Sequence, residues 1–170
     1  MRKQIFQAIC ARLTERVTDI LFIDLWNNNV QMLNGGAVWP LPAVFVEFEP
    51  IEWRQQNNGA RRGDVAVRRQ LVTRSVSTHG AADPKMSDAL GFLDLIDQIN
   101  AAMQGLRGDN FSGFQLTTSA TNHDHAELME SVERYTTSAQ DITAVPKAAK
   151  VTGNAKTLRK GKDKDPRAGS

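Results

Sequence analysis

Two neighbouring stretches decide the fold of this 170-residue chain: LPAVFVEF at residues 41–48 and DVAVRRQLVTRSV at residues 64–76. The first is β-branched and aromatic beyond Pro42, and a proline is tolerated at the first position of a strand. The second alternates, with Val65, Val67, Arg69, Leu71 and Thr73 on one side, as in a strand with one buried face. Residues 54–63 between them are polar and contain glycine, which predicts a loop. The two stretches therefore predict a long antiparallel β-hairpin.

Helical patterns and further strands surround this hairpin. Residues 3–18 predict an amphipathic helix, and residues 20–26 predict a short strand or a buried connection. After a linker at 79–84, a second helix is expected over 87–105, with Ser87 as its N-cap. Its expected apolar stripe comprises Ala89, Phe92, Leu93, Ile96, Ile99, Ala102, Met103 and Leu106. Strands at 114–120 and 129–139 follow, joined by a loop at 121–125. The order predicts an α+β fold: a mostly antiparallel sheet with two helices on one face.

Charge divides the chain near Val145. Residues 147–170 hold eight Lys or Arg and two Asp, a net charge of +6, whereas the whole chain carries only +2. The first 146 residues therefore carry −4. Beyond Val145 the composition is too polar to bury the surface that folding requires. We expect one folded domain over 1–145 and a disordered basic tail over 146–170.

Composition excludes several classes of protein. Cys10 is the single cysteine, so no disulfide framework forms within the chain, which fits a reducing compartment. No stretch approaches the roughly 20 apolar residues of a membrane span. Arg12, Glu15 and Arg16 interrupt the apolar run that a signal peptide needs. We expect synthesis in the cytoplasm, no export and no membrane partner.

No stretch predicts catalysis. His123, Asp124 and His125 are the best candidate ligands for a metal, but they fall in a predicted loop without a further partner at ligand spacing, which favours a solvated turn. Asp94 and Asp97 lie one helical turn apart beside the apolar stripe, as on a solvated helix flank. The sequence has no nucleophile elbow and no glycine-rich phosphate loop. We therefore expect a protein that is not an enzyme and binds no cofactor or metal.

Charged and aromatic residues instead predict contact surfaces. Arginines gather on the hairpin at positions 54, 61, 62, 68, 69 and 74, and an acidic flank of the second helix carries Asp88, Asp94 and Asp97. The arginines are typical either of a solvated edge that resists aggregation or of a surface that meets a partner subunit. Trp26, Trp39 and Trp53 flank the first strand and predict burial in a core or in an interface. Both alternatives stay open at this point.

The chain resembles the tail terminator, or tail completion, proteins of long-tailed bacteriophages and prophages. Four stretches carry the resemblance: the N-terminal helix with Ile5, Ile9 and Leu13; the segment WPLPAVFVE at 39–47; the hairpin ending in RQLVT at 69–73; and the helix ALGFLDLIDQI at 89–99, followed by two strands. It covers most of residues 1–142 and rests on the pattern and order of elements. The basic tail is not expected of that family.

This resemblance implies a structural virion protein, made in the cytoplasm of the host bacterium. Members form a ring, usually a hexamer, at the head-proximal end of the tail tube, where they stop polymerisation and dock the neck of the head. Its partners would be further copies of the chain, the tube protein, a neck or head-closure protein and the sheath in a contractile tail. Candidate contact residues are Trp53, Arg54, Arg61, Arg62, Arg68, Arg69, Asp94 and Asp97.

Two alternatives remain. A head-closure or adaptor protein of the neck belongs to the same class, and sequence alone separates it poorly from a terminator. A nucleic-acid-binding module belongs to another class, because the basic tail would attract phosphates non-specifically. Its candidate DNA-facing residues are Lys156, Arg159, Lys160, Lys162 and Lys164. The acidic domain lacks an aromatic and basic platform, which disfavours that alternative.

Overall fold

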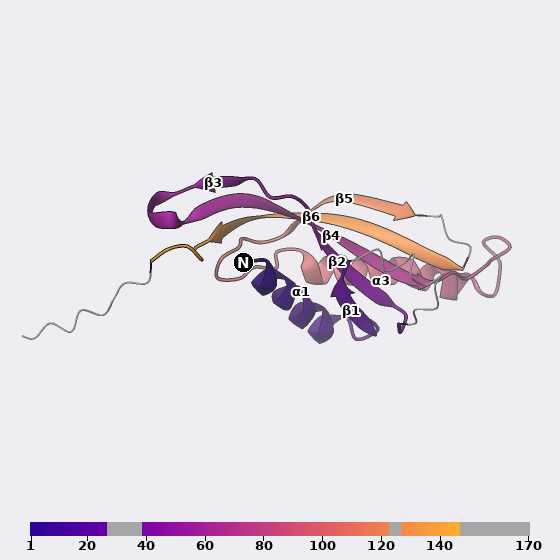
Figure 1. The fold of residues 1–170 in the computed structure, drawn as a ribbon. Helices are drawn as coiled ribbons and strands as arrows, with labels where there is room; N and C mark the ends of the chain where they lie inside the picture. Colours follow the sequence, from indigo (N-terminus) through magenta and orange to yellow (C-terminus); the bar gives the residue numbers. More distant parts are fainter. Residues whose placement is uncertain (27–38, 123–126, 147–170) are drawn as a thin grey trace, which may run out of the picture.

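The computed structural model describes residues 1–26, 39–122 and 127–146 (Figure 1). Its elements are α1 (Arg2–Arg16), β1 (Phe22–Leu25), β2 (Ala43–Phe48), β3 (Trp53–Gln55), a short 3-10 turn (Asn57–Gly59), β4 (Arg61–Arg74), α3 (Met86–Met103), β5 (Gln115–Asn122) and β6 (Leu128–Asp141). The predicted α+β class is confirmed. Residues 20–26, which predicted a strand or a buried connection, contain the strand β1.

The strands form one sheet in the order β1-β2-β4-β6-β5, and β3 pairs with the first part of β4. Only the β1–β2 pair is parallel. β4 and β6 are the two long strands and pair without interruption from Arg61↔Asp141 to Arg74↔Leu128. Within the described residues, β1 and β5 stand at the two ends of this order, and the short β3 is a further edge strand because it pairs only with β4.

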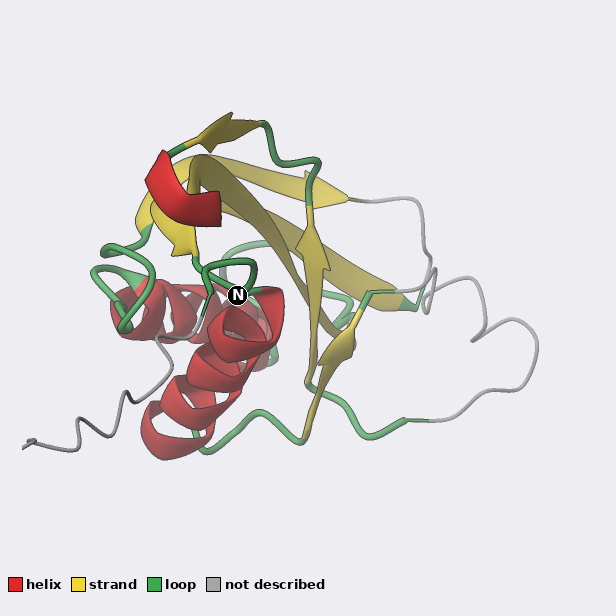
Figure 2. Cartoon of the chain, turned by 60° about the vertical axis from the view of Figure 1, so that its left-hand side comes forward, coloured by secondary structure: helices red, strands yellow, loops and turns green. Residues whose placement is uncertain are grey.

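Both helices lie on one face of the sheet, as the two views of the ribbon show (Figures 1 and 2). Alternate residues of β2 and β4 face the helices, because side chains alternate along a strand. Fully buried members of this core are Ile5, Ile9 and Leu13 of α1, Val44 of β2, Val65, Val67 and Leu71 of β4, and Ile99 and Met103 of α3. Burying one such side chain contributes about 1.5–3 kcal/mol. This face therefore holds the main core.

A smaller aromatic cluster occupies the opposite face of the sheet. Phe45 is fully buried there, and the rings of Phe22, Trp26 and Trp39 each meet it edge-on at centroid distances of 5.3–6.0 Å. The cluster explains why four successive residues of β2, Ala43 to Val46, are buried although only alternate ones face the helices. Trp26 and Trp39 are half-buried, so this packing agrees with the core alternative for both while leaving part of each ring accessible.

Two local predictions about a loop and a helix cap are wrong. Residues 54–63 do not form a loop: most of them belong to β3, the 3-10 turn and the start of β4. Ser87 is not the N-cap of α3, since the helix begins one residue earlier and Lys85 occupies that position without a side-chain bond. Asp83 orders this end instead, because its carboxylate accepts the backbone N–H groups of Lys85 and His79 at 2.8 and 2.7 Å.

Leu93 is not part of the apolar stripe of α3. It is 52 % exposed, whereas Leu95, which the predicted stripe omitted, is buried with Phe92, Ile99, Ala102 and Met103. The buried face is thus rotated by part of a turn relative to the prediction. As a result Leu93 lies with Asp94 and Asp97 on the solvent side of the helix.

Candidate assembly surface

The sheet extends beyond both helices at one end, where the start of β4 pairs with β3 on one side and with the end of β6 on the other (Figure 1). We call this extension, residues 53–64 and 138–141, the arm. Asn58 and Gly59 turn the chain with positive φ angles of 63° and 83°. A Cβ on Gly59 would lie 2.7 Å from the carbonyl oxygen of Ala144, so the segment after β6 packs closely on this turn.

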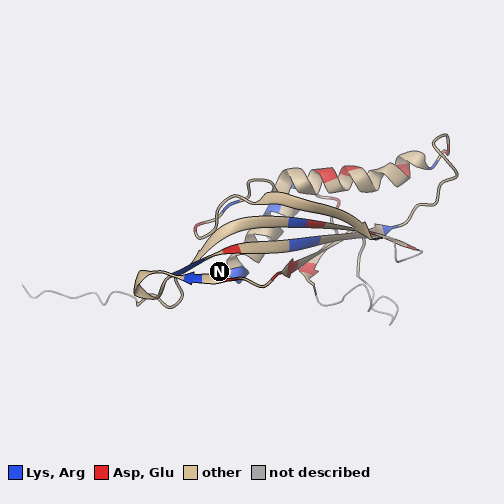
Figure 3. Ribbon diagram, turned by 90° about the horizontal axis from the view of Figure 1, so that it is seen from above, with Lys and Arg blue, Asp and Glu red and all other residues tan. Residues whose placement is uncertain are grey.

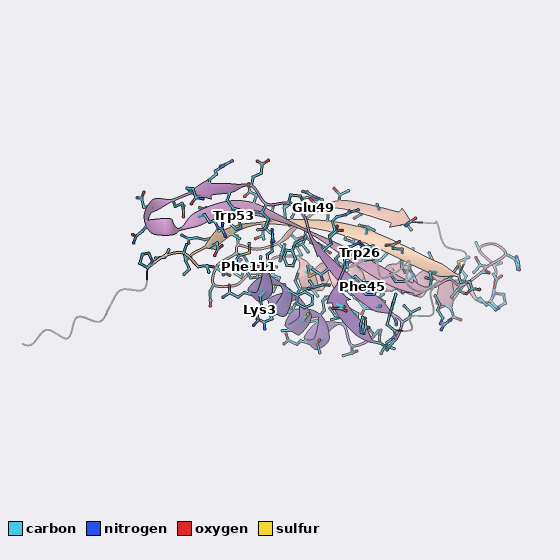
Figure 4. The ribbon with its side chains drawn as sticks, viewed as in Figure 1. Lys3, Trp26, Phe45, Glu49, Trp53 and Phe111 are labelled. Carbon is cyan, nitrogen blue, oxygen red and sulfur yellow. The ribbon has the colours of Figure 1, made fainter. Side chains whose placement is uncertain are left out.

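The helix side of the arm is held by interactions around Trp53. Trp53 pairs across the strands with Gly63, and a Cβ on Gly63 would lie 3.1 Å from the indole. The Arg61 guanidinium lies 4.9 Å from the centre of the indole ring and also binds the Asp141 carboxylate at 2.7 Å. Figure 4 shows Trp53 on the arm, on the same side as the loop that carries Phe111. Arg61 and Trp53 are therefore held by contacts within the chain.

Asp141 fixes the end of β6 to the arm. The pKa of its carboxyl group is lowered to about 2, first by the Thr143 hydroxyl, which donates to it, and then by the Arg61 guanidinium. The Thr143 backbone N–H donates a further bond at 3.0 Å. These bonds stabilise the ionised form, so Asp141 neutralises Arg61 at neutral pH.

The outer side of the arm carries two arginines without such neutralisation. Arg54 and Arg62 stand directly opposite each other on β3 and β4, and both are exposed. Arg62 donates its Nε–H to the Ser138 hydroxyl at 3.0 Å. Among the described residues neither arginine has a carboxylate within 4.0 Å, whereas Arg61, Arg68, Arg69 and Arg134 each do. The outer side of the arm therefore presents two available cations.

Two adjoining hollows flank Arg62. The smaller, of about 300 Å³, lies between β6 and the loop that carries Asn110 and Phe111. The larger, of about 690 Å³, runs along β3. Carboxylates also border them, namely Glu52, Asp64 and Asp109. The mixed charge of this lining suits a protein surface better than a polyanion.

Arg68 belongs to the middle of the outer face and not to the arm. It pairs with Glu47 at 3.5 Å, and the neighbouring Arg134 binds Glu49 through two nitrogens at about 3.0 Å. Both arginines are therefore neutralised across the sheet. The predicted arginine surface thus divides into paired residues on the sheet and available residues on the arm.

Arg69 was predicted to lie at a contact surface, and that prediction is wrong. It is fully buried between the sheet and α3. Its Nη2 donates to Asn100 at 3.2 Å and lies 4.0 Å from Glu133, while Nε and Nη1 have no protein partner among the described residues. Asn100 also accepts the Tyr135 hydroxyl, and Glu133 accepts the hydroxyls of Ser131 and Ser119. Burial lowers the pKa of Arg69.

This buried polar cluster had a signal in the sequence. Arg69 falls on the alternating side that also contains Val67 and Leu71, so the pattern itself placed it in the core. The register of β4 and β6 then puts Glu133 directly opposite it. The missing information was this pairing partner, because an unpaired arginine is rarely buried.

Asp94 and Asp97 are exposed on α3, as predicted. Figure 3 shows acidic residues along this helix, and α3 contains no Lys or Arg. Leu90 and Leu93 are 47 % and 52 % exposed beside them. The flank therefore combines apolar and acidic groups, and it lies apart from the arm, so the structure does not bring the two predicted surfaces together within one copy.

The structure does not place the remaining predicted site residues. His123, Asp124, His125 and the basic tail with Lys156, Arg159, Lys160, Lys162 and Lys164 lie outside the described residues. Within residues 1–26, 39–122 and 127–146, no group of three or more His, Cys, Asp or Glu side chains could hold a metal ion. None of the helices in that part of the chain is long and apolar enough to cross a membrane.

Comparison with known proteins adds no relative. No protein-family model matches the chain, and no curated protein matches it. The arm, the edges of the sheet and the flank of α3 are therefore the surfaces that bear on function.

Proposed function

We propose that this chain is a structural subunit of a phage tail, forming a ring at the head-proximal end of the tail tube. There it stops polymerisation of the tube and joins the tail to the neck. The order of elements supports this proposal, since α1, the hairpin strands β2 and β4, α3 and the pair β5–β6 follow each other as in the resemblance described above, with β1 and β3 as additional strands. The proposal needs surfaces for assembly and no reaction.

The arm is the observation that supports this proposal most directly. It reaches past both helices, so its outer side can contact another protein without disturbing the core (Figure 1). Arg54 and Arg62 are opposed like charges, an arrangement that costs about 0.2–1 kcal/mol in a sheet. An acidic surface on a partner would relieve this repulsion and gain two ion pairs. We assign the arm to the tube or the neck, which a ring must bind on either side.

The test compares two arginine variants in full-length protein. Arg54→Glu with Arg62→Glu reverses the available charges of the arm, and Arg74→Glu is the matched control at the opposite end of β4. Negative-stain microscopy of the purified protein should show rings for all three proteins. Mixed with growing tail tubes, wild type and control should shorten the tubes and mark one end, whereas the double variant should not.

A wild-type protein that stays monomeric by light scattering at all concentrations, while tubes grow to unchanged length, would remove the proposed function. A double variant that caps tubes as well as the wild type would leave the proposed function standing and remove only the role of the arm in docking. Circular dichroism and thermal unfolding of each variant confirm that the fold is intact.

A further inference from the structure

Besides the three-residue β3 of the arm, which pairs only with β4, the sheet has two free edges within the described residues. β5 pairs only with β6, and β1 pairs only with β2. A free edge presents unpaired backbone N–H and C=O groups, which readily pair with another strand. Both edges are therefore potential contact sites.

β5 lacks most of the features that protect edge strands. Its sequence, QLTTSATN, has no charged residue, no proline and no glycine, and a register shift between Leu116 and Thr118 is its one irregularity. All of its residues except Asn122 are exposed. Natural proteins usually place charges or proline on an edge that must stay unpaired. The composition of β5 therefore indicates an edge that is covered in the assembled state.

Exposed leucines lie near both of these edges. Of the six large exposed apolar residues in the described part, Leu90 and Leu93 lie on α3 and Leu116 on β5, while Leu21 precedes β1 and Leu25 is its last residue. Asn100 of α3 bonds to β6, and Gln104, the C-cap of this helix, bonds to β5, so the α3 flank that includes Leu93 faces the β5 side. Leu21 and Leu25 each lie two residues from Ile23 and so share its face of the strand, and Ile23 packs against the helix-side core. Both sets of leucines thus lie on the helix side of their edge.

The two helices carry opposite charge. α1 has four basic residues and one Glu, a net charge of +3, and α3 has three Asp and no basic residue, a net charge of −3. Asp19 and Asp24, which follow α1, reduce the charge of residues 1–26 to +1. α1 lies beside the half of the sheet that contains β1, and α3 lies beside the half that contains β5 (Figures 1 and 3), so the helices at the two edges differ in the sign of their charge.

We propose that copies of this chain associate edge to edge, with β5 and α3 of one copy against β1 and α1 of the next. This contact extends the sheet, brings the leucines of the two edges together and places the acidic helix beside the basic one. The inference rests on the proposed ring and names the contact between its subunits.

Strand directions agree with this arrangement. β1, β2 and β6 run one way and β4 and β5 the other, so two copies in the same orientation bring β5 and β1 together antiparallel. The contact is heterologous and closes into a ring if the rotation between copies closes. A symmetrical β5–β5 contact would instead place two α3 helices of charge −3 side by side, and a β1–β1 contact would do the same with two α1 helices of charge +3. Charge therefore favours the unlike edges.

Charge reversal tests the pairing of unlike edges. Asp94→Lys with Asp97→Lys turns α3 from −3 to +1, and Lys3→Glu with Arg16→Glu turns α1 from +3 to −1. Each change alone should weaken self-association about tenfold at low salt, measured by sedimentation velocity. Combining both changes in one chain should restore it, because unlike charges then face each other again. The Arg74→Glu control, away from both edges, should associate as the wild type does.

Cross-linking tests the geometry independently of charge. In a Cys10→Ser background, Asp24→Cys on β1 and Thr118→Cys on β5 provide one thiol at each edge. A short bis-maleimide should link the double-cysteine chain into a ladder of multimers and leave both single-cysteine chains unlinked. Dimers from a single-cysteine chain would overturn the proposal in favour of a symmetrical contact. Rings that form normally but give no ladder would overturn the proposed contact while leaving the proposed function intact.

Discussion

Arg69 and Glu133 form a buried ion pair at the centre of the contact between the sheet and α3. Arg69→Ala would leave the Glu133 carboxylate buried with only serine hydroxyls as donors. We expect the free energy of unfolding to fall by about 3–5 kcal/mol, because an unpaired buried charge is costly. Urea denaturation monitored by tryptophan fluorescence measures this loss.

Two further variants distinguish the loss of the buried ion pair from a general destabilisation of the fold. Arg68→Ala, on the opposite side of the same strand, removes an exposed ion pair and should cost at most about 1 kcal/mol. Arg69→Leu combined with Glu133→Leu removes both charges and should recover most of the stability lost in Arg69→Ala. If Arg69→Ala and Arg68→Ala lower the free energy of unfolding equally, the buried ion pair stabilises the fold no more than the exposed pair does.

The ionised Asp141 carboxylate makes the stability of the fold depend on pH in the acid range. Its folded pKa of about 2 lies below the value of about 3.9 for an unfolded chain. A lowered pKa stabilises the fold above the unfolded value, and this contribution is lost as the pH falls through the folded value. Asp141→Asn should therefore lower the urea midpoint at pH 7, with a difference from wild type that shrinks between about pH 4 and 2. A difference that is constant over this range would contradict the role of ionised Asp141.

At the scale of elements, two glycines predict opposite responses to the same substitution. A Cβ on Gly63 of β4 would lie 2.6 Å from the Glu52 carbonyl oxygen, so Gly63→Ala should push β3 away and cost about 1–3 kcal/mol. A Cβ on Gly91, in the exposed part of α3, meets nothing within 4 Å, so Gly91→Ala should stabilise the helix by about 0.5–1 kcal/mol. Thermal unfolding of both variants measures the two signs, and a stabilised Gly63→Ala would show that β3 is loosely attached.

The helices and strands show which parts of the fold can be predicted from sequence patterns. Periodicity placed both helices and all the long strands, because burial of one face imposes it. It missed β3, whose three residues are too short and polar to show a pattern. Of the candidate contact residues, the exposure of Arg54, Arg62, Asp94 and Asp97 agreed with local polarity. The burial of Arg69 depends on Glu133 and Asn100, which lie far away in the sequence, and local composition does not record that pairing.

At the scale of the whole molecule, charge is separated three ways. The arm presents two available arginines, the two helices have opposite signs, and residues 147–170 carry +6 against −4 for the rest of the chain. An acidic body repels nucleic acid, so contact with DNA would depend on the tail.

This separation predicts which residues set the salt dependence of DNA binding. Replacing Lys156, Arg159, Lys160, Lys162 and Lys164 with Gln removes five of the eight basic residues of the tail. Each phosphate contact contributes about −0.9 to the slope of log affinity against log salt, so the slope should become shallower by about 4–5. Fluorescence anisotropy with a short random duplex, at several salt concentrations, measures it. Arg54→Gln with Arg62→Gln is the control and should leave the slope unchanged. The opposite result, a slope that depends on the arm and not on the tail, would assign contact with DNA to the arm.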